Sequence, residues 1–170
     1  LAKIYGADVN NAKIAGLLHD CAKNMNYEEL LEIVHENEVK FDFEIEKIPK
    51  VLHAFVGAIV ARQEFDIQDS KILQAIRLHS TGGRNMTILD KIIYLSDKIE
   101  PLRHFKGIEK VRQMAINNLD RALLMLLDKG VVSLIHRGLS IYPATIVYLL
   151  WVLSAGWATS ARLGPTSFRR

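Results

Sequence analysis

The segment Thr87-Ile-Leu-Asp-Lys-Ile-Ile-Tyr-Leu-Ser-Asp-Lys-Ile-Glu-Pro101 has the pattern of a single helix packed against a core. Thr87 followed by Asp90 is typical of a helix start, because the short side chain can accept from orphan amides while the acid reaches back. Pro101 cannot continue a helix, so the predicted helix ends near Ile99. Asp97 therefore lies close to the end of a helix, separated by Ser96 from the apolar run of residues 92–95.

The same helical period extends along the chain on both sides of this segment. Apolar residues recur at spacings of three and four, Gly and Pro are sparse at 10 and 4, and no convincing strand alternation is present. The sequence therefore predicts an all-α fold, a compact single-domain helical bundle. The other predicted helices run from near Asn10 to the region of His19, from Tyr27 to about Asn37 after an Asn26 and Glu29 start signal, from about Pro49 to Glu64, from about Asp69 to His79, from Ile108 to about Asp128, and from near Thr145 to Leu153.

Composition narrows the class of protein. A chain of 170 residues with 49% hydrophobic content is long enough for one domain with a real core. Lys and Arg number 22 and Asp and Glu 19, which gives no argument for a nucleic-acid partner. Cys21 is the single cysteine, so an intramolecular disulfide and a Cys-based zinc site are excluded and a cytoplasmic location is expected. The first residues do not resemble a signal peptide, and we expect the natural protein to begin further upstream.

The C-terminal segment differs from the rest of the sequence. Residues 139–160 contain no charged side chain, a length that would permit a membrane span. Pro143, Ser154 and Gly156 interrupt the run, so a core helix is favoured over a membrane segment. Residues 155–170 lack helical periodicity. A third possibility for the C-terminal segment is therefore that its end is not native to the protein. We accordingly divide the chain into a domain over residues 1–145 and an atypical helix and tail over residues 146–170.

Five residues of metal-ligand type lie at or within predicted helices with apolar neighbours. They are the adjacent pair His19 and Asp20, then His53, His79 and Asp97. A buried His or Asp must be paired or bound to a metal. Imidazole and carboxylate together suit iron, manganese or zinc better than calcium or magnesium. The sequence therefore predicts one metal-binding pocket to which several helices contribute.

Each of these residues also has an ordinary structural explanation. A single His such as His53 in an apolar helix is more often a hydrogen-bonded core residue than a ligand. Asp97 alone could pair with Lys98 or Arg103 in a modest surface ion pair. It is the joint occurrence on separate helices that favours metal binding. The remaining histidines, His35, His104 and His136, have charged or helix-terminal surroundings and are predicted to have structural roles only.

Four blocks of sequence together resemble one known family. They are Gly-Leu-Leu-His19-Asp20 with Lys23, Val51-Leu52-His53-Ala54, Ala75-Ile76 with His79-Ser-Thr-Gly82, and Leu89 to Pro101 with Arg103. The order and spacing resemble the symmetrical diadenosine-tetraphosphate hydrolases of the YqeK type, within the HD metallophosphohydrolase superfamily. The similarity runs from about Leu1 to Thr145. The His19-Asp20 pair alone would indicate only the superfamily.

The resemblance implies a helical domain that holds a divalent metal and splits diadenosine tetraphosphate into two ADP. Iron is the metal it favours, with manganese, cobalt or zinc as alternatives. Carried over by position, His19, Asp20 and Asp97 would be metal ligands, and His53 and His79 would hold a second metal or face the substrate phosphates. Asp20 would orient or deprotonate the attacking water. Along the phosphate path the resemblance implies contacts from Lys23, Ser96, Lys98 and Arg103, with Thr81 and Gly82 shaping the loop beside His79.

The sequence departs from the family pattern in three ways. The family's first metal-binding His corresponds to a position before Leu1, so the domain is expected to be N-terminally truncated here. Ser80 stands where Thr is usual, and the tail after about Thr145 differs from the family's usual end. Two other functions stay open at this point: a different HD-type hydrolase, acting on alarmones or phosphodiesters, and a non-catalytic nucleotide-binding module. Apolar faces on the predicted helix from Ile108 also leave a homodimer open.

Overall fold

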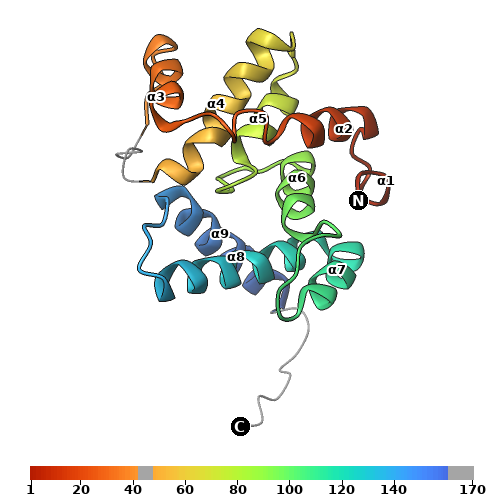
Figure 1. The fold of residues 1–170 in the computed structure, drawn as a ribbon. Coiled ribbons are helices and arrows are strands. Elements are labelled where there is room, and N and C mark those ends of the chain that lie inside the picture. The colour runs from red at the N-terminus through yellow and green to blue at the C-terminus, as the bar shows by residue number, and fades with distance from the viewer. Residues whose placement is uncertain (42–47, 161–170) are drawn as a thin grey trace.

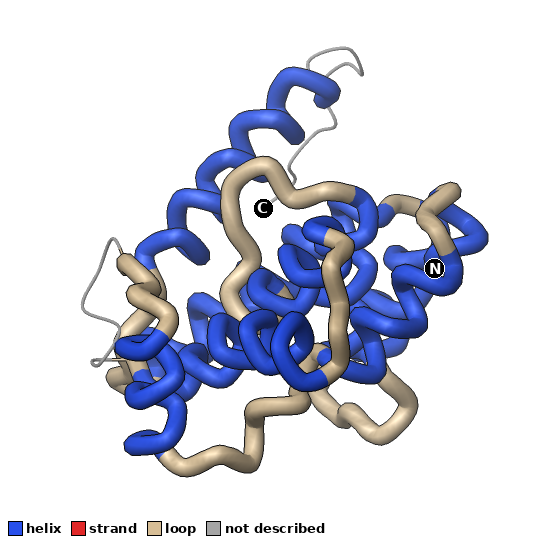
Figure 2. The backbone as a smooth tube through the Cα atoms, turned by 90° about the horizontal axis from the view of Figure 1, so that it is seen from above, coloured by secondary structure: helices blue, strands red, loops and turns tan. Residues whose placement is uncertain are grey.

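The computed structural model describes residues 1–41 and 48–160, with side chains through Ser154. Within these ranges every regular element is a helix and none is a strand (Figure 2), which confirms the all-α fold class. The helices are α1 (Ala2–Tyr5), α2 (Val9–Leu18), α3 (Tyr27–Glu36), α4 (Pro49–Glu64), α5 (Ser70–Leu78), α6 (Ile88–Ile99), α7 (Ile108–Asn117), α8 (Leu119–His136) and α9 (Pro143–Ser160).

Two groups of helices meet at α6. Helices α2 to α5 lie on one side and α7 to α9 on the other, with α6 between them (Figure 1). Helix α5 packs against α2, α4 and α6, and α8 packs against α6, α7 and α9. One core cluster joins α6 to α7, α8 and α9 around Leu95 and Leu123, and a second joins α2, α4, α5 and α6 around Ile76. The bundle therefore brings the ends of α2, α5 and α6 close together.

Local start signals set several helix boundaries as predicted. The Asn26 side chain accepts from the Glu29 amide and the Glu29 carboxylate accepts from the Asn26 amide, which begins α3. The same reciprocal pair forms between Thr87 and Asp90 at the start of α6. Asp90 is fully buried, and its Oδ2 also accepts from the Gln74 amide at 2.7 Å. This start signal thereby also ties α6 to α5.

The predicted single helix from Ile108 to about Asp128 is wrong, because the chain breaks at Asn118. That residue is extended, with φ −155° and ψ 101°, and its side chain accepts from the Arg121 amide. Asn is among the best helix-starting residues. It begins a new helix, α8, which continues to His136, and the apolar period of the sequence runs through the break because both helices pack on one core.

Helix α9 covers the loop that follows His79. Tyr148 and Val152 are buried in the core, and the Thr145 hydroxyl donates to the Thr81 carbonyl at 2.8 Å. These contacts confirm a core helix across the apolar segment. None of the described helices is long and apolar enough to cross a membrane. The prediction of a non-native end concerns residues that mostly lie outside the described part of the chain.

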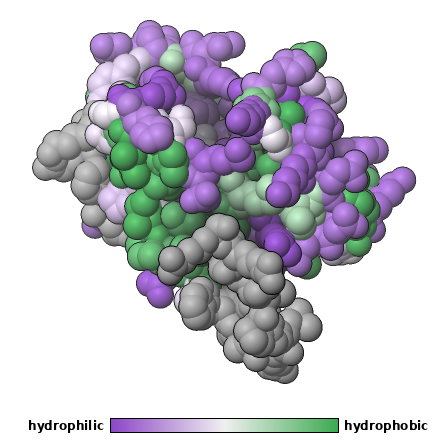
Figure 3. Space-filling view, turned by 90° about the horizontal axis from the view of Figure 1, so that it is seen from below, coloured by the Kyte–Doolittle hydropathy of each residue, from purple (hydrophilic) through white to green (hydrophobic). Residues whose placement is uncertain are grey.

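Apolar side chains also gather on the lower face of the molecule, over α8 and α9 (Figure 3). Val132 and Ile135 of α8 are 43% and 60% exposed, and Leu150 and Trp151 of α9 are 60% and 43% exposed. The outer side of α9 is therefore apolar as well as the side that packs on the core.

Gly82 gives a test of how tightly α9 holds this loop. Its φ is +66°, and a Cβ placed on it would lie 2.9 Å from Cδ1 of the buried Tyr148 ring. We expect Gly82→Ala to lower the free energy of unfolding by about 2–4 kcal/mol, from backbone strain plus overpacking. Gly138→Ala is the matched control, because Gly138 has φ +60° but open space around it. Equal losses in urea unfolding of the two variants would contradict a close packing of Tyr148 on the loop.

Candidate active site

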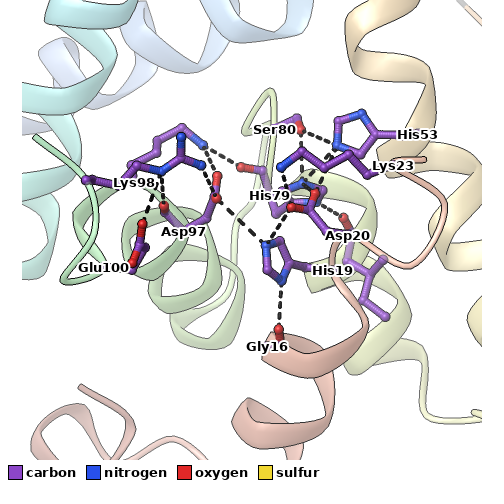
Figure 4. A network of polar contacts seen from close by, with 12 residues as sticks. Gly16, His19, Asp20, Lys23, His53, His79, Ser80, Asp97, Lys98 and Glu100 are labelled. Atoms are coloured by element: carbon purple, nitrogen blue, oxygen red, sulfur yellow. Dashed lines mark hydrogen bonds and ion pairs between the residues drawn. The ribbon is translucent and has the colours of Figure 1, made fainter.

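The structure brings all five predicted ligand residues together at helix ends. His19 and Asp20 follow the last residue of α2, His79 follows α5, His53 lies in the first turns of α4 and Asp97 in the last turn of α6 (Figure 4). The Asp20 carboxylate is at the centre. Its Oδ1 lies 3.4 Å from Nε2 of both His53 and His79, and its Oδ2 lies 3.4 Å from Nε2 of His19.

The three imidazoles make the same kind of backbone contact, which selects the tautomer of the neutral ring. In each ring Nδ1 lies against the carbonyl three residues earlier: Gly16 at 2.7 Å for His19, Lys50 at 3.0 Å for His53 and Ile76 at 2.7 Å for His79. A carbonyl can only accept, so Nδ1 carries the hydrogen and Nε2 of the neutral ring has a free lone pair. Histidines that ligate metals are typically held in this way. Three Nε2 lone pairs are thereby aimed at one region.

The nitrogen and oxygen atoms that face this region are suited to bind a metal cation. Nε2 of His53 and Nε2 of His79 lie 3.3 Å apart although neither carries a hydrogen in this tautomer. The Ser80 hydroxyl lies 3.3 Å and 3.1 Å from these two atoms and can donate to only one of them. One ligand atom each from His19, Asp20 and His79 lies within 4.8 Å of the other two. Imidazole nitrogen with carboxylate oxygen is a donor set for iron, manganese, cobalt or zinc.

Burial keeps the deepest histidine in its ligand form. The His79 side chain is almost completely buried, and burial lowers its pKa to about 4. Burial also lowers the pKa of His53. Both rings are therefore neutral near pH 7. The pKa of His19 is raised, because its ring interacts with the Asp97 carboxylate 3.7 Å away.

Asp97 is held from three sides. Its Oδ1 accepts from Nη2 of Arg103 at 3.0 Å, and its Oδ2 lies 3.4 Å from Nζ of Lys98. Burial alone would raise the pKa of the Asp97 carboxyl, but His19 and these two cations hold it well below its ordinary value. Asp97 is consequently an anion with a fixed orientation.

Lys98 connects Asp97 to the loop that carries His79. Its ammonium donates to the His79 carbonyl at 2.7 Å and lies 3.7 Å from the centre of the Tyr94 ring. Burial lowers the pKa of Lys98 to about 8, so it remains mostly protonated at pH 7. These contacts occupy most of its hydrogen-bonding capacity and favour a positioning role.

Lys23 takes a different position from Lys98. Its ammonium is bonded to Oδ2 of Asp20, and the side chain is 51% exposed. Burial by itself would raise the pKa of the Asp20 carboxyl, but Lys23 and His19 hold that pKa below its ordinary value. Because an ammonium has three N–H groups and the side chain is half exposed, Lys23 can also neutralise a phosphate at the mouth of the site.

The structure does not bring three of the predicted substrate-contacting residues into this cluster. Thr81 is buried and its hydroxyl donates to the Gly82 carbonyl, while Gly82 packs against Tyr148. Ser96 is half-buried and makes no side-chain hydrogen bond with the described residues. Thr81 and Gly82 thus shape the loop beside His79, and a contact of any of the three with substrate stays a prediction.

Some functional groups were missed by sequence reasoning. The backbone carbonyls of Gly16, Lys50 and Ile76 leave no signature in the sequence, because every residue supplies such a carbonyl. Ser80 was noted only as a departure from Thr, and the structure places its hydroxyl between two imidazoles. Glu100 lies 3.6 Å from Nε of Arg103, an i,i+3 pair that the sequence alone could have suggested.

Comparison with a known protein family defines the class to which this fold and site belong. Residues 1–102 match the family model described as the HD domain. A crystal structure from Clostridium acetobutylicum, described as a predicted HD superfamily hydrolase involved in NAD metabolism, is similar with a TM-score of 0.88 and 38% identity, over 91% of this chain and 82% of that one. The helical bundle with its His and Asp cluster is thus that of an HD-domain hydrolase.

Curated relatives narrow the class further. The chain is 41% identical over 146 residues to a protein of Halalkalibacterium halodurans, covering 86% of this chain and 78% of that protein. It is 36% identical over 154 residues to a protein of Bacillus subtilis, covering 91% and 82%. Both are named bis(5'-nucleosyl)-tetraphosphatase, symmetrical. The chain belongs to the symmetrical bis(5'-nucleosyl)-tetraphosphatase family of HD-domain hydrolases.

Proposed function

We propose that this protein hydrolyses diadenosine tetraphosphate symmetrically, with water, to two molecules of ADP. The observation that carries the proposal is the convergence of three imidazole Nε2 atoms on the Asp20 carboxylate, each at 3.4 Å. Family membership supplies the substrate class, since the similar proteins of Halalkalibacterium halodurans and Bacillus subtilis bear the name of that activity.

For the metal, we propose iron, held by His19, Asp20 and Asp97, with His53 and His79 either holding a second ion or facing the phosphates. The imidazole nitrogens and the two ionised carboxylates support a divalent transition metal, and iron among these metals is what the family resemblance implies. Manganese, cobalt and zinc prefer overlapping donor sets and are the alternatives for the metal assay below. The oxygen of Ser80 adds a polar group on the His53 side of the cluster.

The side chains around the cluster can carry the remaining steps. A divalent metal bound there would lower the pKa of water and draw charge from a phosphate oxygen. Asp20 would orient the attacking water and accept its proton, since its carboxylate lies at the centre of the cluster. Lys23 would neutralise charge that develops on the phosphates. Arg103 would do so with the guanidinium N–H groups that Asp97 leaves free.

A substrate panel tests this function against its rivals. We expect turnover of diadenosine tetraphosphate to exceed that of guanosine tetraphosphate alarmones and of a simple phosphodiester by at least about tenfold in kcat/KM, because only the first has a nucleotide for each side of the cluster. Preferred cleavage of an alarmone or phosphodiester would replace the proposal with another HD-type hydrolysis. Tight nucleotide binding without turnover would indicate a non-catalytic module.

The metal assignment has its own assay. Chelator-treated protein is expected to be inactive and to regain most activity with ferrous iron under anaerobic conditions, with smaller recoveries for manganese, cobalt or zinc. Elemental analysis of the purified protein gives the number of metal ions bound per chain. Absence of turnover with every one of these metals would contradict a metallohydrolase.

A further inference from the structure

A basic cleft lies beside the active site, between the α6–α7 loop and the C-terminal half of α8. Its volume is about 790 Å³, within the range of nucleotide-sized sites. Five cationic side chains and only two carboxylates line it; the cations are Lys98, Arg103, Lys106, Lys129 and Arg137, and the carboxylates are Asp97 and Asp128. Phe105, Leu126 and Val132 add an apolar wall. The lining thus combines positive charge with a surface on which a base could rest.

The outer cations of this cleft have no partner of their own. Within the described residues, the side chains of Lys106 and Arg137 make no hydrogen bond or ion pair, and both are exposed. Lys129 donates to the Lys106 carbonyl at 3.1 Å and lies 5.9 Å from the Phe105 ring, so it holds the loop against α8. Because cations outnumber carboxylates in the lining, the cleft favours the binding of an anion of more than one charge.

The cleft borders the cluster of His and Asp side chains, with which it shares lining residues. Asp97, Lys98 and Arg103 line the cleft and also belong to the polar network around His19. Figure 4 shows Lys98 and Glu100 on one side of His19 and Asp20, with Lys23 and His53 on the other side. A ligand that passes over the cluster can therefore reach exposed cations at both ends.

Symmetric cleavage requires room for two equal halves of the substrate. When water attacks one of the two central phosphorus atoms and its bond to the bridging oxygen breaks, a nucleoside diphosphate is left on each side of the broken bond. We infer that the basic cleft binds one nucleoside-diphosphate half of the dinucleotide, with Lys106 and Arg137 contacting its phosphates, while the Lys23 and His53 side receives the other half. This inference rests on the proposed function, and it assigns a binding site to residues outside the sequence blocks shared with the family.

The test removes the two unpartnered charges together. In Lys106→Gln/Arg137→Gln we expect kcat/KM for diadenosine tetraphosphate to fall about tenfold, mainly through KM, because two exposed charge-assisted contacts are lost. The dissociation constant for ADP, measured by titration calorimetry on the metal-loaded protein, should rise by a similar factor. Both losses should shrink at high ionic strength.

A matched control separates a local contact from a change in net charge. Lys110→Gln/Arg121→Gln removes one exposed Lys and one exposed Arg from α7 and α8 outside the cleft, and neither KM nor ADP affinity should change. If the two double variants have equal KM and ADP affinity, the cleft is not a nucleotide site even though the enzyme cleaves its substrate. If the wild type shows no turnover, the proposed function fails, and ADP titration of the same variants alone decides whether the cleft binds nucleotide.

Discussion

Asp20→Ala should reduce turnover of diadenosine tetraphosphate by about 10³-fold or more, the largest effect expected of any single substitution here. Its carboxylate oxygens lie 3.4 Å from Nε2 of each of His19, His53 and His79. Without it, a metal ligand and the proposed proton acceptor are lost together. Initial rates of ADP release, measured with added metal, give the comparison.

The same variant should keep its helical circular-dichroism spectrum. Asp20 lies in the turn after α2 and its side chain is 27% exposed, so no core packing depends on it. Glu32→Ala, which removes an exposed carboxylate from α3, is the control and should leave turnover unchanged. Loss of helical signal in Asp20→Ala would mean that Asp20 serves the fold. Turnover near that of the Glu32→Ala control would remove Asp20 from the mechanism.

Lys98→Met should weaken metal binding by about 10- to 100-fold, the loss typical of a residue that orients ligands. The Lys98 ammonium donates to the His79 carbonyl at 2.7 Å and contacts Asp97, so it fixes the loop and the carboxylate on which the site depends. Metal titration by calorimetry measures the change. With metal in excess, KM should stay close to the wild-type value.

This experiment also decides between two roles for Lys98. The sequence resemblance predicts a residue on the phosphate path, in which case KM would rise and metal affinity would be unaffected. Lys91→Met serves as the control, because Lys91 lies on the same helix and pairs with Asp120 away from the cluster. A metal affinity of Lys98→Met equal to that of Lys91→Met would rule out the positioning role.

Much of the fold was predictable because its signals are local. The reciprocal bonds of Asn26 with Glu29 and of Thr87 with Asp90 depend on residues three apart, and Pro49 begins a helix at a position that needs no amide. The break at Asn118 was missed because one short polar residue decided it inside a continuous apolar period. With the apolar period continuing on both sides, Asn118 could not be told apart from an ordinary polar residue on the exposed face of one helix.

The site was predictable as a set of residues but not as a geometry. Ligand-type side chains among apolar neighbours indicated a common pocket, and the structure places the three histidines around Asp20 and Asp97 beside His19. Which cation orients a ligand and which one is free for phosphate depends on contacts between distant segments. Lys98 bonds to the His79 carbonyl across 19 residues of chain, while Lys23 remains half exposed. Neither the contact of Lys98 nor the exposure of Lys23 could be obtained from spacing in the sequence.

Product analysis of the metal-loaded protein tests the central claim most directly. Diadenosine tetraphosphate is incubated with the protein and iron, and the products are separated by anion-exchange chromatography at early times. The proposed site, with a nucleoside diphosphate on each side of the P–O bond that breaks, predicts ADP as the sole nucleotide product. Equal amounts of ATP and AMP would contradict symmetric cleavage and, with it, the arrangement of the substrate across the cluster.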